Sequence, residues 1–184
     1  MAHRYLSELI TPDVRAAQVE RHGRSIELLP AAEPELLTAA EVEFIGRRDS
    51  FYLASISSSG WPYLQHRGGP PGFLKVLDPG TLAFADLRGN RQLITAGNLR
   101  GDDRVSLLLM DYPHRERLKI LGHARAIEGD AALARRVIPE GLERKVERII
   151  RIEVAAYDWN CPAHITPRFT EAEVREALAG GWRP

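Results

Sequence analysis

Residues 51–99 read FYLASISSSGWPYLQHRGGPPGFLKVLDPGTLAFADLRGNRQLITAGNL, and this segment decides the fold. It consists of short apolar runs separated by Ser-Ser-Gly, Gly-Gly-Pro-Pro-Gly and Asp-Pro-Gly. Turn-forming residues between runs rich in aromatic and aliphatic side chains are typical of consecutive antiparallel strands. The segment therefore predicts strands over residues 51–57, 61–67, 73–77 and 81–86, followed by a helix that starts at Asn90 and ends near Leu99.

Cationic and amide side chains gather at two points in this segment. One group lies on neighbouring predicted strands, and the other lies where the last strand turns into the helix. The first group is Gln65, His66, Arg67 and Lys75, and the second is Arg88, Asn90, Arg91 and Gln92. A helix N-terminus with unpaired N–H groups and nearby arginines binds anions. The pattern indicates a phosphate site, although a capped helix with solvated arginines would look the same.

The rest of the chain predicts more strands of the same sheet and several flanking helices. Strands are expected over residues 104–111, 117–127 and 148–157, with Leu118, Ile120, Gly122, Ala124 and Ala126 on one face of the second. Thr11 and Gly23 bound a helix over residues 12–22, and a capping box of Thr38 and Glu41 opens a helix whose buried side is Val42, Phe44 and Ile45. Helical pieces follow at 130–137 and 142–146, and Thr170 opens a last helix that ends near Gly180.

These elements predict a mainly β protein, a barrel of six or so antiparallel strands with flanking helices. We expect residues 1–37 to form a helical arm and connector, residues 38–169 the barrel, and residues 170–184 a C-terminal helix. The 184 residues suit one domain. The connecting turn at 111–114 is expected to be exposed.

Composition excludes several classes of function. The 25 basic and 25 acidic side chains balance, which argues against nucleic acid or an anionic membrane as partner. Cys161 is the single cysteine, so no internal disulfide forms, and its Pro neighbour makes a packing role more common than a nucleophilic one. The six histidines show no metal-ligand spacing, and no dinucleotide or Walker motif is present. No apolar run spans a membrane and no signal sequence opens the chain, so we expect a cytoplasmic protein.

The order of these motifs resembles the FMN-binding split-barrel proteins related to pyridoxamine 5'-phosphate oxidase. The likeness runs from Thr38 to Arg168 and rests on Gly-Trp-Pro, Gln-His-Arg-Gly-Gly, Phe-Leu-Lys, Leu-Ala-Phe-Ala-Asp, Gly-Asn-Arg-Gln and Asp-Asp-Arg-Val-Ser-Leu-Leu-Leu-Met-Asp-Tyr. The resemblance implies a Greek-key-like split barrel and a homodimer with FMN at the subunit interface. The positions that match the family's cofactor contacts are Arg67, Lys75, Ala85, Asp86, Asn90, Arg91 and Gln92. The turn has Asn-Arg-Gln where family members have a Ser-Arg-Lys-like sequence, so one positive charge is missing.

A loop near the C-terminus is a second candidate for cofactor contact. Residues 158–168 hold Trp, Asn, Cys, His and Arg without helix or strand periodicity, a composition that is typical of binding loops. In related flavoproteins this segment of one subunit reaches the flavin of the other. The resemblance therefore nominates Trp159, Asn160 and His164 for the flavin edge or the substrate, with Arg168 a weaker candidate. In the alternative interpretation, Trp159 is a core aromatic and His164 is a residue whose hydrogen bonds are satisfied.

The function predicted from the resemblance is that of an FMN-dependent oxidoreductase acting on a small molecule, with NAD(P)H as a candidate donor. Gln65 or Gln92 would bond the flavin ring or its ribityl chain. The Arg-rich C-terminal motif of enzymes that oxidise pyridoxamine phosphate is not found, so that reaction is not assigned. The alternatives are a flavin-binding sensor without turnover, or a relative that binds the deazaflavin F420 or haem.

Overall fold

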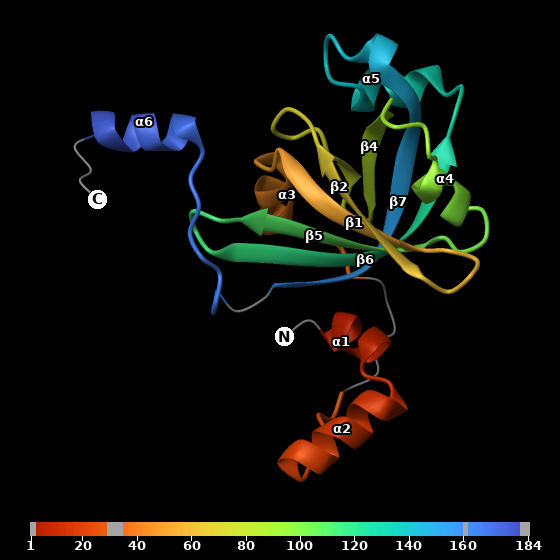
Figure 1. Ribbon diagram of the computed structural model, residues 1–184, viewed down its shortest axis with the longest axis vertical. Coiled ribbons are helices and arrows are strands. Elements are labelled where there is room, and N and C mark those ends of the chain that lie inside the picture. Colours follow the sequence, from red (N-terminus) through yellow and green to blue (C-terminus); the bar gives the residue numbers. More distant parts are fainter. Residues whose placement is uncertain (1–2, 29–34, 160–161, 181–184) are drawn as a thin grey trace.

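The computed structural model describes residues 3–28, 35–159 and 162–180. Its strands are β1 (Ser50–Ile56), β2 (Pro62–Gly68), β3 (Lys75–Asp78), β4 (Thr81–Leu87), β5 (Arg104–Asp111), β6 (Glu116–Ile127) and β7 (Val146–Trp159). Its helices are α1 (His3–Leu9), α2 (Pro12–His22), α3 (Ala39–Gly46), α4 (Ile94–Asn98), α5 (Ala131–Val137), the 3₁₀ helix η1 (Glu143–Lys145) and α6 (Glu171–Ala179). Figure 1 shows the strands curled into a barrel, with α3, α4 and α5 around it and α2 and α6 projecting away from it.

All seven strands form one antiparallel sheet in the order β2-β1-β5-β6-β7-β4-β3. The two ends of the sheet are therefore β2 and β3, and no backbone ladder joins them. The predicted mainly β class and split barrel are confirmed, with one strand more than the six or so expected. The strand boundaries lie within about two residues of the predicted ones, because apolar alternation and turn residues define them directly.

The barrel interior is filled by one face of each long strand. On β1, Phe51 and Leu53 are buried at 1% exposure each, and the residues between them are half-buried. The Phe51 ring lies 5.4 Å from Phe73 and 5.2 Å from Phe84, so three aromatic rings from different strands and loops meet in the core. Such burial contributes about 25 cal/mol per Å² of apolar surface and is the main driving force of the fold.

The predicted inward face of β6 is confirmed from Leu118 to Ala124, whereas Ala126 is exposed. A bulge in the β6–β7 ladder lies between Leu121 and Gly122, and the inward alternation continues past it, since Gly122 and Ala124 are both buried. A Cβ at Gly122 would lie 2.6 Å from the Glu153 carbonyl oxygen, so only glycine fits there.

The capped helices agree with the sequence. Thr11 accepts from the Val14 N–H and Gly23 adopts a left-handed φ of 74°, which bounds α2 as predicted. Both capping boxes, at Thr38 and at Thr170, are formed. On α3 the prediction that Val42 is buried is wrong, since it is 39% exposed and Glu41 is buried in its place. Helix α1 was not predicted, because its sequence lacks a capping signal.

The predicted helix start at Asn90 is wrong. Helix α4 begins at Ile94, and the residues before it form an irregular loop. Asn90 accepts the Gln92 N–H with its side-chain oxygen at 3.1 Å, which makes a local turn in place of a helix cap. Leu93, which directly precedes α4, is 49% exposed and has a φ of 56°. Asp111, expected in an exposed turn, ends β5 and is 6% exposed.

No helix among the described residues is both long and apolar enough to span a bilayer. Nor do His, Cys, Asp and Glu side chains in the described ranges gather in threes where they could hold a metal ion.

Candidate functional site

The open seam of the barrel is bridged by side chains in place of a backbone ladder. Arg67 on β2, one end of the sheet, places Nη1 2.6 Å from Oδ1 of Asp86 on β4, next to the other end. Both side chains are almost fully enclosed, at 12% and 11% exposure. An ion pair that is buried to this degree is strongly destabilising to break, because it leaves an uncompensated charge. The pair therefore joins the two ends of the sheet.

Helix α4 is tied into the same cluster. The Arg67 Nη2 donates to the hydroxyl of Thr95 at 3.0 Å, and that hydroxyl lies 3.3 Å from Oε1 of Gln65. On the other side, Arg148 on β7 approaches Asp86 with Nε at 3.6 Å, which is an ion pair but too long for a hydrogen bond. The cluster thus connects strands β2, β4 and β7 with the helix.

Two N–H donors in this cluster have no acceptor. Nε of Arg67 and Nε of Arg148 are both buried, and within the described part of the chain neither makes a hydrogen bond. A buried donor without a partner costs about 1–3 kcal/mol. Such groups are rare in folded proteins and point to a missing water, ion or ligand atom.

The loop between β4 and α4 closes the site and is conformationally unusual. Arg91 and Leu93 have φ values of 62° and 56°, in the left-handed region that side chains other than glycine avoid. A Cβ at Gly89 would meet nothing within 4 Å, so the backbone is open there. Strained backbone of this kind is concentrated at ligand sites.

Six of the predicted cofactor residues meet around one pocket, which we call the corner pocket. They come from β2, from β4 and from the loop that precedes α4: Gln65, Arg67, Asp86, Asn90, Arg91 and Gln92. The free volume among them is about 40 Å³ in the single chain, which is room for one or two waters. The structure thus brings these six side chains together, and their contact with a cofactor stays a prediction.

Three predicted residues lie elsewhere. His66 alternates with Gln65 and Arg67 on β2, so it faces the outer side of the sheet, where it contacts Tyr52 edge-on at 5.6 Å. Lys75 is opposite Ala83 in the β3–β4 ladder, on the face that packs under α5, and Ala85 is on this face as well. The structure thus separates these three from the corner pocket within a single chain.

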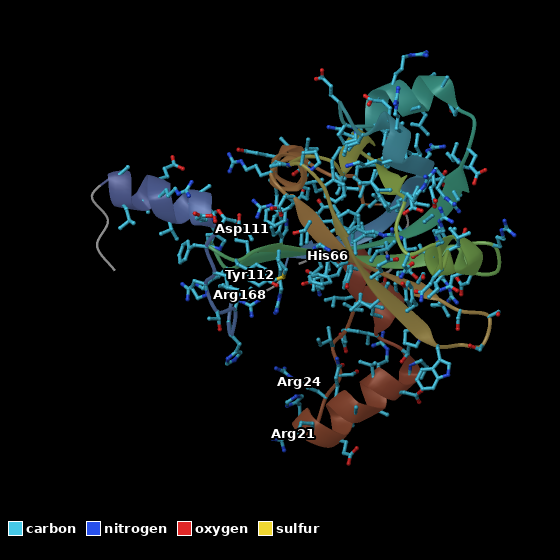
Figure 2. All side chains as sticks on the ribbon, turned by 45° about the horizontal axis from the view of Figure 1, so that its top comes forward. Arg21, Arg24, His66, Asp111, Tyr112 and Arg168 are labelled. Carbon is cyan, nitrogen blue, oxygen red and sulfur yellow. The ribbon has the colours of Figure 1, made fainter. Side chains whose placement is uncertain are left out.

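The late loop is only partly described. The Trp159 indole N–H donates to Glu41 at 2.6 Å, and its ring contacts Phe44 edge-on at 4.7 Å. Burial alone would raise the pKa of Glu41, but hydrogen bonds from Thr38 and Trp159 outweigh it and lower the pKa. Asn160 lies outside the described residues. His164 is exposed with a φ of 65°, and Arg168 stacks on Tyr112 at 5.0 Å, as Figure 2 shows.

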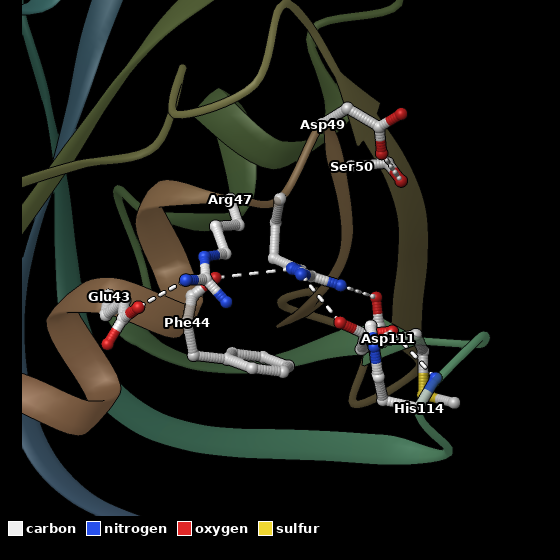
Figure 3. Close-up of polar contacts among 9 residues, drawn as sticks. Glu43, Phe44, Arg47, Asp49, Ser50, Asp111 and His114 are labelled. Carbon is white, nitrogen blue, oxygen red and sulfur yellow. Dashed lines mark hydrogen bonds and ion pairs between the residues drawn. The ribbon is translucent and has the colours of Figure 1, made fainter. Parts of the chain in front are cut away.

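A second polar cluster lies between α3 and the end of β5 (Figure 3). The Arg48 Nη2 is 2.7 Å from Oδ2 of Asp111, and the His114 ring nitrogen Nδ1 is 2.9 Å from Oδ1. Burial would raise the pKa of Asp111, but hydrogen bonds from His114 and the charge of Arg48 lower it. The cluster lines a different cavity, of about 370 Å³, which also holds Trp159.

Sequence reasoning missed Thr95 and Glu147, which line the corner pocket, and Arg148, which lies beside it and pairs with Asp86. Thr95 is the one buried residue of α4. A polar residue on the inward side of a helix is a sequence signal that could have indicated its place in the site. Arg148 lies opposite Asp86 in the β4–β7 ladder, a pairing between strands about sixty residues apart that sequence alone does not define.

The family model described as pyridoxamine 5'-phosphate oxidase matches residues 37–159, about two thirds of the chain. The chain belongs to the pyridoxamine 5'-phosphate oxidase family. The corner pocket of this family member lies wholly within the matched range, whereas α1, α2 and α6 lie outside it. No curated protein is similar enough to match the sequence.

Solved structures share the fold of this pyridoxamine 5'-phosphate oxidase family member at low identity. A putative pyridoxamine 5'-phosphate oxidase from Lactobacillus delbrueckii has a TM-score of 0.54 and 18% identity, over 71% of this chain and 99% of that one. HupZ from Group A Streptococcus has a TM-score of 0.51 and 13% identity, over 66% and 92%. A conserved hypothetical protein from Mycobacterium tuberculosis has a TM-score of 0.50 and 18% identity, over 77% and 96%. Likeness at these identities concerns the fold alone.

Proposed function

We propose that this protein binds FMN with the phosphate in the corner pocket and serves as an FMN-dependent oxidoreductase for a small molecule. The observation that carries the proposal is the convergence of Gln65, Arg67 and the 90–92 loop on one pocket at the barrel seam. When bound, the flavin would supply hydride or electron transfer, and the protein would supply orientation and charge.

The charge of the corner pocket suits a phosphate monoester. In and beside the corner pocket, Arg67, Arg88, Arg91 and Arg148 stand against three carboxylates, Asp86, Glu128 and Glu147, so four positive and three negative charges leave a net charge of +1. A phosphate monoester carries about −1.5 to −2 at neutral pH. A phosphate here would bring the local charge close to zero.

The available donors also suit an anion. Arg91 makes no hydrogen bond or ion pair with any described residue, so its guanidinium is available for a ligand. Nε of Arg67 is an unsatisfied donor in the same cluster. Arginine binds phosphate through paired N–H groups. Turns that combine right-handed and left-handed backbone conformations, such as the turn around Arg91, orient successive backbone N–H groups toward an anion.

We propose further that the working unit is a homodimer with the flavin between subunits. The β1–β2 hairpin exposes Trp61 at 76% and Leu64 at 64%, and α6 buries no residue of its own in the single chain. Exposed apolar surface of this kind marks interfaces. Trp159, His164 and Arg168 remain candidates for contact with the partner's flavin, and sedimentation of the purified protein tests the dimer.

The binding test compares FMN with riboflavin, which lacks the phosphate. Protein freed of any bound flavin should bind FMN at least about tenfold more tightly than riboflavin, and Arg91→Ala should reduce FMN affinity about tenfold. Arg91 has no structural partner, so the variant should keep its stability within about 0.5 kcal/mol. Fluorescence quenching of the flavin measures both affinities.

Arg21→Ala is the matched control, because this exposed arginine of α2 does not line the corner pocket. Equal affinity for FMN and riboflavin would contradict the phosphate site. If FMN binds but NADH, NADPH and candidate substrates leave its absorption unchanged, the site holds flavin and the oxidoreductase part of the proposal fails.

A further inference from the structure

A third cavity lies on the outer face of the barrel, beneath α1, and shares no lining residue with the corner pocket. Its volume is about 400 Å³, within the range of about 300–1,000 Å³ that small-molecule sites occupy. The floor consists mostly of small and aliphatic side chains from four strands of the sheet: Ala54 and Ile56 of β1, Ser106 of β5, Leu121 of β6 and Ala155 of β7. Apart from the Ser106 hydroxyl, the side chains of this floor are apolar.

Helix α1 forms the wall of this cavity and is held firmly on the sheet. Tyr5 and Ile10 are buried at 4% and 9% exposure, and the Lys119 ammonium lies 4.3 Å above the Tyr5 ring. Lys119 is itself paired with Asp158 at 2.8 Å. Because α1 precedes residue 37, this cavity depends on a segment that the family match does not include.

One cation at the cavity has unused hydrogen-bonding capacity. Nε of Arg4 is buried without an acceptor among the described residues, and its Nη2 is 3.9 Å from Glu8, too far for a hydrogen bond. The other basic side chains at the cavity are already engaged. Arg104 is bound to Asp102 at 2.9 Å through Nε, and His123 to Asp103 at 2.8 Å.

We propose that this cavity binds a small molecule with an apolar chain or ring and a terminal carboxylate, the carboxylate pairing with Arg4. Apolar burial on the sheet would supply most of the affinity, and the unsatisfied guanidinium would select the anion. An arginine and a carboxylate form two parallel hydrogen bonds. The ligand carboxylate would therefore accept from Nε of Arg4 and from a second N–H of the same guanidinium. This site is independent of the flavin site.

The test is calorimetric titration of the purified protein with decanoate and with decanol, which share the chain and differ in charge. One decanoate should bind per chain, at least about tenfold more tightly than decanol, since a hydrogen bond between two charged groups is stronger than one to a neutral hydroxyl. Arg4→Gln should remove this preference, and Glu8→Gln should strengthen decanoate binding several-fold. Arg21→Gln, on α2 and outside the cavity, should change neither affinity.

A second experiment fills the cavity with a larger side chain. Ala155→Phe should weaken decanoate binding at least tenfold, and Ala126→Phe, at an exposed position of β6 outside the cavity, should not. Equal binding of decanol and decanoate, or binding that Ala155→Phe leaves unchanged, overturns the proposal. A change in oligomeric state on Ala155→Phe also overturns it, because a second copy would then occupy this face. Flavin absorption of the same samples reports separately on the corner pocket.

Discussion

The buried arginine–aspartate pairs Arg48–Asp111 and Arg67–Asp86 differ in how completely the hydrogen bonds of the arginine are made. Arg48 uses every nitrogen: Nε donates to the Phe44 carbonyl at 3.3 Å, Nη1 to the Met110 carbonyl at 3.2 Å, and Nη2 pairs with Asp111 at 2.7 Å. Arg67 pairs with Asp86 equally closely but leaves Nε without an acceptor. The saturated pair holds α3 to β5, whereas the unsaturated pair keeps capacity for a ligand.

The largest expected effect comes from breaking the saturated pair. Arg48→Met should lower the free energy of unfolding by about 3–5 kcal/mol, because Asp111 would keep its charge without its main partner. Flavin affinity of the folded protein should stay within twofold, since Arg48 does not line the corner pocket. Urea denaturation and flavin titration measure the two quantities. A loss of stability below about 1 kcal/mol would show that the pair is not structural.

Breaking the unsaturated pair should reduce stability less, and FMN affinity more, than breaking the saturated pair. Arg67→Met should cost less stability, about 1–3 kcal/mol, because Arg148 still lies 3.6 Å from Asp86. FMN affinity should fall about 100-fold, which corresponds to about 2.7 kcal/mol. The same two measurements apply. If both arginine variants lost stability equally and kept full FMN affinity, Arg67 would stabilise the fold without contributing to FMN binding.

The region of the saturated pair also predicts a pH dependence. Glu41 has a lowered pKa in the folded protein, so its contribution to stability is present above its unfolded pKa of about 4.3 and is lost as pH falls through the folded value. Glu41→Gln should lower stability by about 1–2 kcal/mol at pH 7, the net worth of about one charged hydrogen bond. At pH 3 this difference from the wild type should shrink.

Urea denaturation at the two pH values, followed by Trp159 fluorescence, measures the effect, since the indole donates to Glu41. Glu43→Gln is the control, because that side chain is 64% exposed and pairs with Arg47 on the surface. A difference that stayed constant with pH would mean that Glu41 does not contribute through its charge.

The contrast between the two regions also explains what the sequence could predict. The barrel followed from alternation on β1 and β6 and from turns such as Asp-Pro-Gly, because each of these is a local signal. The side-chain types and the family resemblance both drew attention to Arg67 and the 90–92 loop, but no local signal places them side by side, since β2 and β4 are joined across the seam by side chains. Arg148 was missed because the β4–β7 register joins distant parts of the chain.

The helix boundary failed for a different reason. Asn90 is a good cap by type, but its side chain bonds the Gln92 N–H within a turn, and the helix starts four residues later. Asparagine stabilises both arrangements through the same side-chain oxygen, so propensity does not distinguish them. The faces of His66 and Lys75 were likewise undecided until the register of each strand was known.

The smallest expected effect concerns the strained backbone at the corner pocket. Leu93 has a φ of 56° and is half exposed, so Leu93→Gly loses little packing and removes a conformational cost. Relative to Leu93→Ala, the glycine variant should be more stable by about 0.5–1 kcal/mol, against the usual order of the two residues. Urea denaturation measures the difference.

Arg115, with a φ of 58° in the turn after β5, is the matched position near the saturated pair, and Arg115→Gly should gain a similar amount over Arg115→Ala. The two sites should then differ in one respect. Because the Leu93 loop lines the pocket, its glycine variant should bind FMN several-fold more weakly as the loop loses its fixed shape, and the Arg115 variant should not. Equal FMN affinity in both would mean that the strain before α4 serves the turn and has no part in binding.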